Sequence, residues 1–376
     1  MATLITNLDQ DKYNPIVVTT KEGKLSSELR KLGIEVKIIP LHPIVNKFGG
    51  QILDYFLFKK TKVLVELLKY NYKVYRWLEE NEINIVYTNG IRSLLYAGLA
   101  ARFRGLPLFK YIRSEGDPSF IFKFLGLKLP TKIITIADGV RSMYTDGELK
   151  KHSEKFTTLY TGFDFEKYKF SKEKKEKDKR KVRKKLDISL DSQIVGIVGS
   201  ITPRKGYDLL VEVASKVTSE INDLQFMVVG NPPQEYTYFR DELKRKVKDK
   251  GMSSQFHWLG YQDDVIPFYN AIDLLVLPSR AEGLPRTVIE GLAMGLPVVA
   301  TNVGGTKEII NSENLGKVIE KDNSEQLGDA ILEVLNNEEL FKEDKAKNRF
   351  EYVKNKFSIP NYIQGFEEII NKELNS

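Results

Sequence analysis

Short runs of apolar, often β-branched residues recur along this chain of 376 residues, and their spacing leaves room for one helix between successive runs. The first half holds such runs at 16–20, 36–40, 85–88, 108–112 and 133–136, and the second half at 194–199, 225–230, 256–260, 274–278, 298–301 and 317–319. Alternating strands and helices predict parallel sheets. The runs are nearly continuous in apolar residues, as expected when helices cover both faces of a sheet. We therefore predict an α/β fold with two parallel-sheet units in series.

A charged segment separates the two sets of predicted strands. Apolar residues almost vanish across 170–185, and 376 residues are more than one hydrophobic core usually holds. We predict a first domain over 1–170, a charged linker over 171–185 and a second domain over 186–355. The remaining residues, 356–376, carry apolar side chains at helical spacing and predict a helix that packs back on the first domain.

The positive charge of the chain is concentrated in that segment. Residues 172–185 hold ten Lys or Arg and three Asp or Glu, which accounts for the whole net charge of +7. The segment is typical of a solvated linker or helix face, with binding to an anionic lipid or polymer as the alternative; it does not indicate nucleic-acid binding. The absence of cysteine excludes disulfides and thiolate chemistry. Neither a signal segment nor a run of about 18 uncharged apolar residues occurs, so we predict a cytoplasmic protein.

The most informative motif follows the predicted strand at 274–278. Glu282 lies in a loop, and Pro285 with the apolar pattern after it places a helix start near 284–287. Unpaired N–H groups at such a start favour an anion such as a diphosphate. Glu290 lies about one turn inside the helix, so the two carboxylates can accept hydrogen bonds from different parts of one ligand. Each glutamate alone is equally typical of a helix entry or a surface position.

This motif resembles the Glu-x7-Glu signature of the GT-B retaining glycosyltransferases of glycosyltransferase family 4, the glycosyl transferases group 1. The turn at Gly304, Gly305 and Glu308 resembles the Gly-Gly-x-x-Glu turn of that family, and the segments 257–261 and 273–279 match as well. The resemblance implies a GT-B fold, with two Rossmann-like parallel-sheet domains facing a central cleft. The first domain would be the acceptor side and the second would bind the nucleotide-sugar donor.

The resemblance also implies roles for individual residues. Glu282 would bind donor-sugar hydroxyls beside the reacting carbon, Glu290 the ribose hydroxyls, and Lys205 the diphosphate, although Lys205 alone also fits a surface turn. Ser200 stands where the family often has Arg, and Arg204 is a candidate replacement. The donor-binding set is Gly199, Ser200, Arg204, Lys205, Gly230, Glu282, Gly283, Leu284, Pro285, Arg286, Thr287, Val288 and Glu290.

The candidate catalytic residues are Glu282, Lys205 and Arg113. Arg113 stands where the family places an acceptor-side His; it can bind phosphate but cannot act as a base at neutral pH. A structural ion pair with Glu115 is the alternative. We expect no metal site, because the one Asp-x-Asp pair, Asp9 and Asp11, precedes the first predicted strand and the histidines are scattered.

Two further expectations concern the first domain. Compared with the family, we expect the chain to start inside the first helix, without the first strand and Gly-rich loop of that domain. Segments 52–77 and 120–129 mix aromatic, aliphatic and basic residues. This composition suits peripheral contact with a membrane, and it suits helices packed on a sheet equally well.

The resemblance implies a retaining, metal-independent hexosyltransferase that uses a nucleotide diphosphate sugar of the UDP or GDP type and needs no cofactor beyond this co-substrate. The acceptor would be a glycan, a lipid-linked molecule or a small molecule, in cell-envelope polysaccharide or glycolipid synthesis. The alternative is a noncatalytic nucleotide-sugar-binding partner subunit, suggested by Ser200 and by the missing N-terminal elements. A sugar-nucleotide epimerase also remains open. A dehydrogenase is disfavoured because no Gly-x-Gly-x-x-Gly turn follows a predicted strand.

Overall fold

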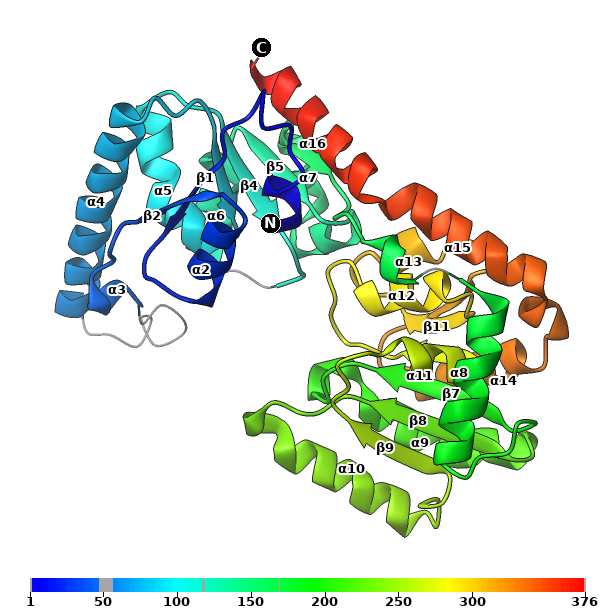
Figure 1. The fold of residues 1–376 in the computed structure, drawn as a ribbon. Coiled ribbons are helices and arrows are strands. Elements are labelled where there is room, and N and C mark those ends of the chain that lie inside the picture. Colours follow the sequence, from blue (N-terminus) through cyan, green and yellow to red (C-terminus); the bar gives the residue numbers. More distant parts are fainter. Residues whose placement is uncertain (1, 47–56, 117–118, 169, 375–376) are drawn as a thin grey trace. The chain divides into compact units, whose positions relative to one another are not determined.

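The computed structural model describes residues 2–46, 57–116, 119–168 and 170–374. The chain forms two compact units. Unit 1 comprises Met1–Ile136, Met143–Gly162 and Ile359–Ser376, and unit 2 comprises Ala137–Ser142 and Phe163–Ser358. Both are built from parallel strands that alternate with helices, as the sequence predicts (Figure 1).

Unit 1 contains two separate parallel sheets. One pairs β1 with β2, and the other has the order β3-β4-β5-β6. The strands are β1 Ile16–Thr19, β2 Glu35–Ile38, β3 Val86–Asn89, β4 Leu108–Ile112, β5 Lys132–Thr135 and β6 Phe156–Thr158. The first five coincide with the predicted runs to within one or two residues. The sequence analysis missed β6, whose three residues are too few to show a period.

The helices of unit 1 supply much of its core. They are α1 Ala2–Ile5, α2 Lys24–Lys31, α3 Pro43–Asn46, α4 Leu57–Glu80, α5 Ile91–Phe103, α6 Phe120–Lys128, α7 Asp146–Lys151 and α16 Ile359–Leu374. Helices α4 and α5 pack together around buried residues such as Tyr70, Val74 and Leu94. The C-terminal α16 belongs to this unit: the ring of Phe366 lies 5.7 Å from that of Tyr87.

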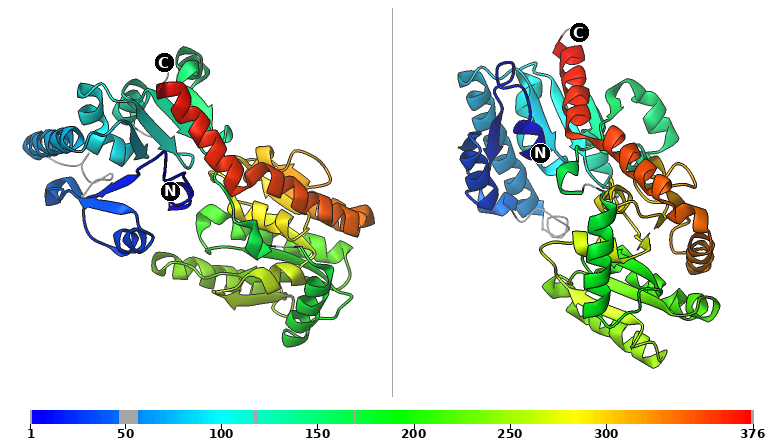
Figure 2. Two further views of the ribbon diagram at one scale, coloured as in Figure 1. Left: turned by 45° about the horizontal axis from the view of Figure 1, so that its top comes forward. Right: turned by 45° about the vertical axis from the view of Figure 1, so that its right-hand side comes forward.

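Unit 2 holds a six-stranded parallel sheet with the order β12-β11-β10-β7-β8-β9. In both views of Figure 2, the strands of this unit lie among helices in the green to orange part of the chain. The strands are β7 Gln193–Val198, β8 Leu224–Val229, β9 Phe256–Gly260, β10 Leu274–Leu277, β11 Val298–Thr301 and β12 Gly316–Ile319, each at its predicted run. The strands β7, β8 and β9 follow one another toward one edge of the sheet. The next strand, β10, pairs with β7 on its other side. The strand order therefore reverses between β7 and β10. In open parallel sheets, ligands bind at the carboxyl ends of the strands at such a reversal.

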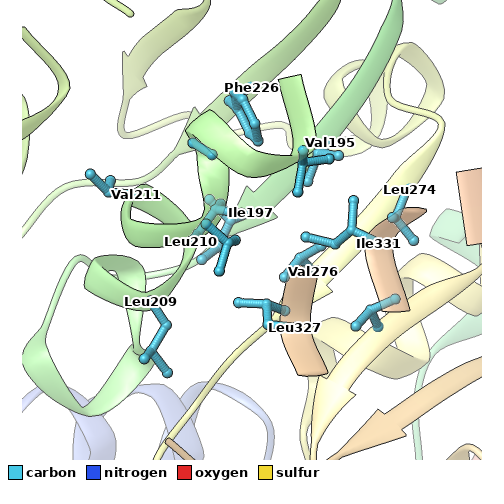
Figure 3. Close-up of a cluster of buried hydrophobic side chains, with 14 of the residues drawn as sticks. Val195, Ile197, Leu209, Leu210, Val211, Phe226, Leu274, Val276, Leu327 and Ile331 are labelled. Carbon is cyan, nitrogen blue, oxygen red and sulfur yellow. The ribbon is translucent and has the colours of Figure 1, made fainter. Parts of the chain in front are cut away.

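The helices of unit 2 fall into two groups. Helices α9 Tyr207–Glu220, α10 Thr237–Asp249 and α14 Ser324–Leu335 cover one face of the sheet and form its main core with the strands. In Figure 3, Leu209, Leu210 and Val211 of α9 and Leu327 and Ile331 of α14 lie with strand residues in this core. The second group includes α8 Lys172–Lys185, α11 Ile266–Ala271, α12 Arg286–Ala293 and α15 Glu343–Phe357; α13 is Thr306–Ile309. None of the described residues of this group belongs to that core; within the group α8 packs against α11 and α12 against α15.

The charged segment predicted as a linker is the helix α8, which packs against α11 inside unit 2. Its anchor is Arg183, a fully buried side chain. The guanidinium donates to the carbonyl oxygen of Ala271 at 3.0 Å and to the carboxylate of Asp273 at 2.7 Å. Further along the helix, Asp178 accepts a hydrogen bond from Asn270. One face of α8 thus packs inside unit 2, because these partners compensate the buried charge of Arg183.

The unit boundaries also differ from the predicted ones at 170 and 355. Unit 2 begins at Phe163 and ends at Ser358, and the short segment Ala137–Ser142 is assigned to it as well. That segment is tied to the Gly-Gly-x-x-Glu turn, because the carboxylate of Glu308 accepts hydrogen bonds from the backbone N–H groups of Asp138 and Gly139 at 2.9 and 2.8 Å.

Candidate functional site

The predicted donor-binding residues of unit 2 lie in the loops at the carboxyl ends of β7, β8 and β10. After β7 the chain passes through Gly199 and Ser200 to a short turn, Pro203–Lys205. After β10 it enters the loop that holds Glu282 and leads into α12. These loops therefore meet at the reversal of strand order, where the fold favours a ligand.

Glycines allow the first two loops to approach each other. Gly199 has φ +147° and Gly230, at the end of β8, has φ +136°, a region that favours glycine. A Cβ atom on Gly230 would overlap the carbonyl oxygen of Gly199. The same carbonyl oxygen accepts a hydrogen bond from the buried Tyr207 hydroxyl at 2.7 Å. The backbone of Gly199 is thus held from two sides, and Ser200 next to it is exposed.

Two basic side chains converge on Glu282. The Nζ atom of Lys205 lies 2.7 Å from Oε1 of Glu282, and Nη1 of Arg204 lies 3.5 Å from Oε2. Glu282 is 9% exposed, whereas the Arg204 side chain is 53% exposed. The Lys205–Glu282 pair is therefore the tight, shielded element, and the more exposed Arg204 also donates to the carbonyl oxygen of Ala281.

An arginine that the sequence analysis did not select locks these loops together. Arg280 forms a bidentate pair with Asp208 at 2.9 and 2.8 Å and bonds Asp322 at 2.6 Å. Its Nη1 also donates to the carbonyl oxygen of Pro203, and its backbone N–H donates to the carbonyl oxygen of Arg204. These hydrogen bonds raise the pKa of Arg280 well above its usual range. In the sequence, the position of Arg280 just after β10 is the one feature that could have indicated its role. Its hydrogen-bond partners come from other loops.

The predicted helix start is confirmed. Pro285 is the N-cap residue and α12 begins at Arg286, so the first N–H groups of the helix lie between Arg286 and Val288. Of these, the N–H of Val288 donates to the carbonyl oxygen of Pro285 at 3.1 Å. The Gly-Gly turn supports this loop from behind: the N–H of Gly305 donates to the carbonyl oxygen of Gly283 at 2.7 Å. A Cβ atom on Gly305 would lie 3.0 Å from Leu284 and 2.6 Å from Ala137.

Glu290 lies on α12 and faces two tyrosines that were not predicted. The hydroxyl of Tyr269 donates to Oε2 of Glu290 at 2.8 Å. The hydroxyl of Tyr168 faces the same carboxylate and lowers its pKa. Burial raises the pKa of Glu290, whereas these hydrogen bonds and the charges of Arg286 and Lys205 lower it. Lys205 therefore acts electrostatically on both signature glutamates, which the structure brings to one site.

Arg113 follows β4 in unit 1 and is exposed. Its charge acts on the nearby hydroxyls of Tyr87, Tyr111 and Tyr362 and lowers their pKa, although burial raises the pKa of all three overall. The Tyr111 hydroxyl is buried without a hydrogen-bond partner. The role predicted for Arg113 stays a prediction.

No group of three His, Asp or Glu side chains among the described residues is placed to hold a metal ion. In the same part of the chain, every helix is too short or too polar to cross a membrane.

Residues 178–355 match the family model described as glycosyl transferases group 1. The match covers the loop with Glu282, the helix α12 with Glu290 and the turn that carries Lys205. It leaves all of unit 1 outside.

Among curated relatives, the chain is 32% identical over 155 residues to the lipopolysaccharide core biosynthesis mannosyltransferase LpsB of Rhizobium meliloti. This match covers 41% of the chain and 44% of the relative, so the chain spans about half the length of the curated relatives it matches first. A longer match, 23% identical, covers 81% of the chain and 80% of the UDP-Gal:alpha-D-GlcNAc-diphosphoundecaprenol alpha-1,3-galactosyltransferase of Escherichia coli.

Among solved structures, HepE of Anabaena in complex with UDP superposes with a TM-score of 0.77 at 18% identity. The superposition covers 99% of this chain and 94% of HepE, which was also solved with UDP-glucose. The likeness confirms the α/β fold with two Rossmann-like domains that the sequence predicts.

Proposed function

Because residues 178–355 belong to the glycosyl transferases group 1, we propose that this protein is a retaining glycosyltransferase. It moves a hexosyl group from a nucleotide diphosphate sugar of the UDP or GDP type to a glycan, lipid-linked or small-molecule acceptor. The observation that carries the proposal is the convergence of Lys205 and Glu282, 2.7 Å apart, with Glu290 on the same helix entrance at the reversal of strand order. Relatives named for lipopolysaccharide and lipid-linked glycan synthesis support a role in the cell envelope.

The chemistry follows from the charges at this site. As the bond between the sugar and the diphosphate breaks, negative charge develops on the leaving diphosphate. In this proposal Lys205, Arg204 and the backbone from Gly283 to Val288 stabilise that charge. Glu282 accepts hydrogen bonds from sugar hydroxyls beside the reacting carbon, and Glu290 accepts those of the ribose. Arg113 serves as a clamp for the acceptor or the diphosphate, so it is assigned to the catalytic set with Glu282 and Lys205.

Fixed cations supply the electrophilic assistance in this proposal, so activity does not require a divalent metal. The test is sugar transfer from UDP- and GDP-sugars in the presence of EDTA, with the anomeric configuration of the product determined by NMR. Retention of configuration and unchanged rates in EDTA support the proposal. Inversion of configuration contradicts the retaining mechanism, and recovery of activity only with added Mg²⁺ or Mn²⁺ contradicts metal independence.

A noncatalytic nucleotide-sugar-binding subunit is the second candidate, favoured by the exposed Ser200 in place of a diphosphate-binding Arg and by the pairing of Lys205 with Glu282. Turnover separates the two functions. Donor hydrolysis or transfer that disappears in Glu282→Ala identifies the enzyme. Tight donor binding without turnover, with every acceptor tried, identifies the subunit.

The long helix α4 supports peripheral contact with an anionic membrane from the cytoplasmic side. Leu64, Leu68 and Tyr72 recur every four residues and are 56%, 48% and 64% exposed, so they form one apolar stripe. Exposed Lys62 and Lys73 flank it. This pattern suits a helix that lies in a membrane interface. The stripe is part of the predicted segment 52–77, of which residues 52–56 lie outside the described residues.

The second predicted segment, 120–129, exposes apolar residues of α6 instead: Phe120 is 82% and Phe124 51% exposed. Co-sedimentation with anionic vesicles tests both surfaces. We expect binding that salt weakens, and that Leu64→Gln with Leu68→Gln, or Phe120→Gln with Phe124→Gln, reduces. Leu190→Gln, at a half-exposed position in unit 2, is the matched control. Absence of binding at low salt contradicts membrane contact.

A further inference from the structure

Tyr269 holds the Glu290 carboxylate from the interior of unit 2. Tyr269 lies on α11, is fully buried, and donates its hydroxyl proton to Oε2 of Glu290 at 2.8 Å. Its ring is enclosed by the core, so the hydroxyl has one accessible direction. The buried Tyr269 hydroxyl therefore restricts the rotation of the Glu290 carboxylate.

Tyr168 approaches the same carboxylate from a different segment, the short turn Phe165–Tyr168. This turn is held by aromatic packing, since the ring of Tyr168 lies 4.9 Å from that of Phe163. The guanidinium of Arg286 lies 5.3 Å from the centre of the Phe163 ring and thereby connects the turn to α12, which carries Glu290. Two independently anchored tyrosines thus face one carboxylate, and the hydroxyl of Tyr269 bonds it directly.

The hydrogen-bonding capacity of the Glu290 carboxylate explains what the tyrosines can contribute to ligand binding. An ionised carboxylate only accepts hydrogen bonds and has about four lone-pair positions. The Tyr269 hydroxyl occupies one of them, on Oε2, and leaves others for a ligand. A ribose presents two neighbouring hydroxyl donors, which require acceptor positions at a set spacing.

We propose that Tyr269 and Tyr168 are positioning residues that fix the Glu290 carboxylate as the acceptor for the two ribose hydroxyls of the donor nucleotide. The inference rests on the proposed function, because it takes Glu290 as the ribose contact. The tyrosines also offset burial: the pKa of Glu290 is raised by desolvation, and hydrogen bonds from both hydroxyls lower it. They thereby favour the ionised, accepting form of the buried carboxylate.

The test compares nucleotide pairs that differ by one hydroxyl. Affinities of UDP and 2′-deoxy-UDP, and of GDP and 2′-deoxy-GDP, are measured by calorimetry on the unmodified chain and on Tyr269→Phe and Tyr168→Phe. For the base that binds, we expect the preference for the ribose form to fall by about tenfold in Tyr269→Phe, the loss of a hydrogen bond to a charged group. Tyr168→Phe should show a smaller loss in the same direction. Tyr352→Phe, which removes a half-buried hydroxyl bonded to the carbonyl oxygen of Glu308, is the matched control.

The pH profile of binding gives a second readout that a purely structural tyrosine does not move. Without the Tyr269 hydroxyl the pKa of Glu290 rises further, so the carboxylate takes up a proton at a higher pH and loses acceptor capacity there. Nucleotide affinity in Tyr269→Phe should therefore fall at a higher pH than in the unmodified chain during acidification. Tyr168→Phe keeps the test open if Tyr269→Phe does not fold, because Tyr168 is only partly buried.

The outcomes distinguish failure of the positioning role from failure of the proposed function. Unchanged ribose preference and an unchanged pH profile in folded Tyr269→Phe and Tyr168→Phe, with nucleotide binding intact, overturn the positioning role and leave the proposed function standing. If neither UDP nor GDP binds the unmodified chain, the proposed function fails and the inference fails with it.

Discussion

Nζ of Lys205 lies 2.7 Å from Oε1 of Glu282, so the lysine expected at the donor diphosphate is paired with the glutamate expected at the donor sugar. Both side chains are largely shielded, at 14% and 10% exposure. Leaving either charge unpaired in this position is costly. When a donor binds, its groups would replace this ion pair. Lys205 would then contact an anionic phosphate, and Glu282 would contact sugar hydroxyls.

Replacing Lys205 with Met should lower kcat/KM for the donor by about 100- to 1000-fold, because a fixed cation at the developing charge is lost. Steady-state kinetics with the nucleotide sugar measures the effect. Lys216→Met is the control, since Lys216 is half-exposed on α9 and pairs with the exposed Asp329. Equal rates for both variants would remove Lys205 from the mechanism.

Gly206 begins α9 directly after Lys205 with φ +67°, and a Cβ atom there would overlap the carbonyl oxygen of Pro278. Gly206→Ala should therefore lower the free energy of unfolding by at least about 3 kcal/mol and weaken donor binding. Gly251→Ala isolates the backbone cost, because Gly251 has φ +71° and nothing within 4 Å of its Cβ position. We expect about 1 kcal/mol there. Urea unfolding distinguishes the two, and similar losses would argue against close packing of the loops.

Burial raises the pKa of Glu290, so the folded state holds a proton there at pH values at which the unfolded chain has lost it. Stability therefore falls as pH rises from the usual carboxyl range through the raised pKa. Glu290→Gln removes this ionisation and should melt at a higher temperature than the unmodified chain at pH 8, with a smaller difference at pH 5. Donor affinity should fall in the same variant. Melting curves at both pH values are the measurement, with exposed Glu351→Gln as control; a gap that grows toward pH 5 would contradict the sign.

Arg183 is the buried anchor of α8, and removing it leaves Asp273 without its closest cation at 2.7 Å. Arg183→Met should lower the free energy of unfolding by about 3–5 kcal/mol. Lys184→Met, one residue on and exposed, should change it by less than about 0.5 kcal/mol. Urea unfolding followed by circular dichroism measures both. Equal values would mean that α8 is a loosely attached helix after all.

The sequence specified the strands well because each is a local pattern. The runs at 108–112 and 256–260 match β4 and β9 residue for residue, and the apolar pattern of a buried parallel strand requires no knowledge of its neighbours. The start of α12 was equally readable, since Pro285 and the following apolar spacing are local signals. The candidate site followed from these elements, because parallel strands bring the loops after β7 and β10 to one edge.

What the sequence could not reveal are the partners that come from distant parts of the chain. Residues 171–185 look like a linker by composition, and only the acceptors at Ala271 and Asp273 make Arg183 a buried anchor. No sequence motif marks Tyr269, Tyr168 or Arg280. Folding brings the two tyrosines next to Glu290 and brings Arg280 next to Asp208. The sequence by itself determined the elements and the chemistry available at their ends, since hydrophobic periodicity acts over a few residues. Only the tertiary structure decided which charges and hydroxyls meet, because a buried polar group is stabilised by whichever partner the packing of remote segments brings within hydrogen-bond distance.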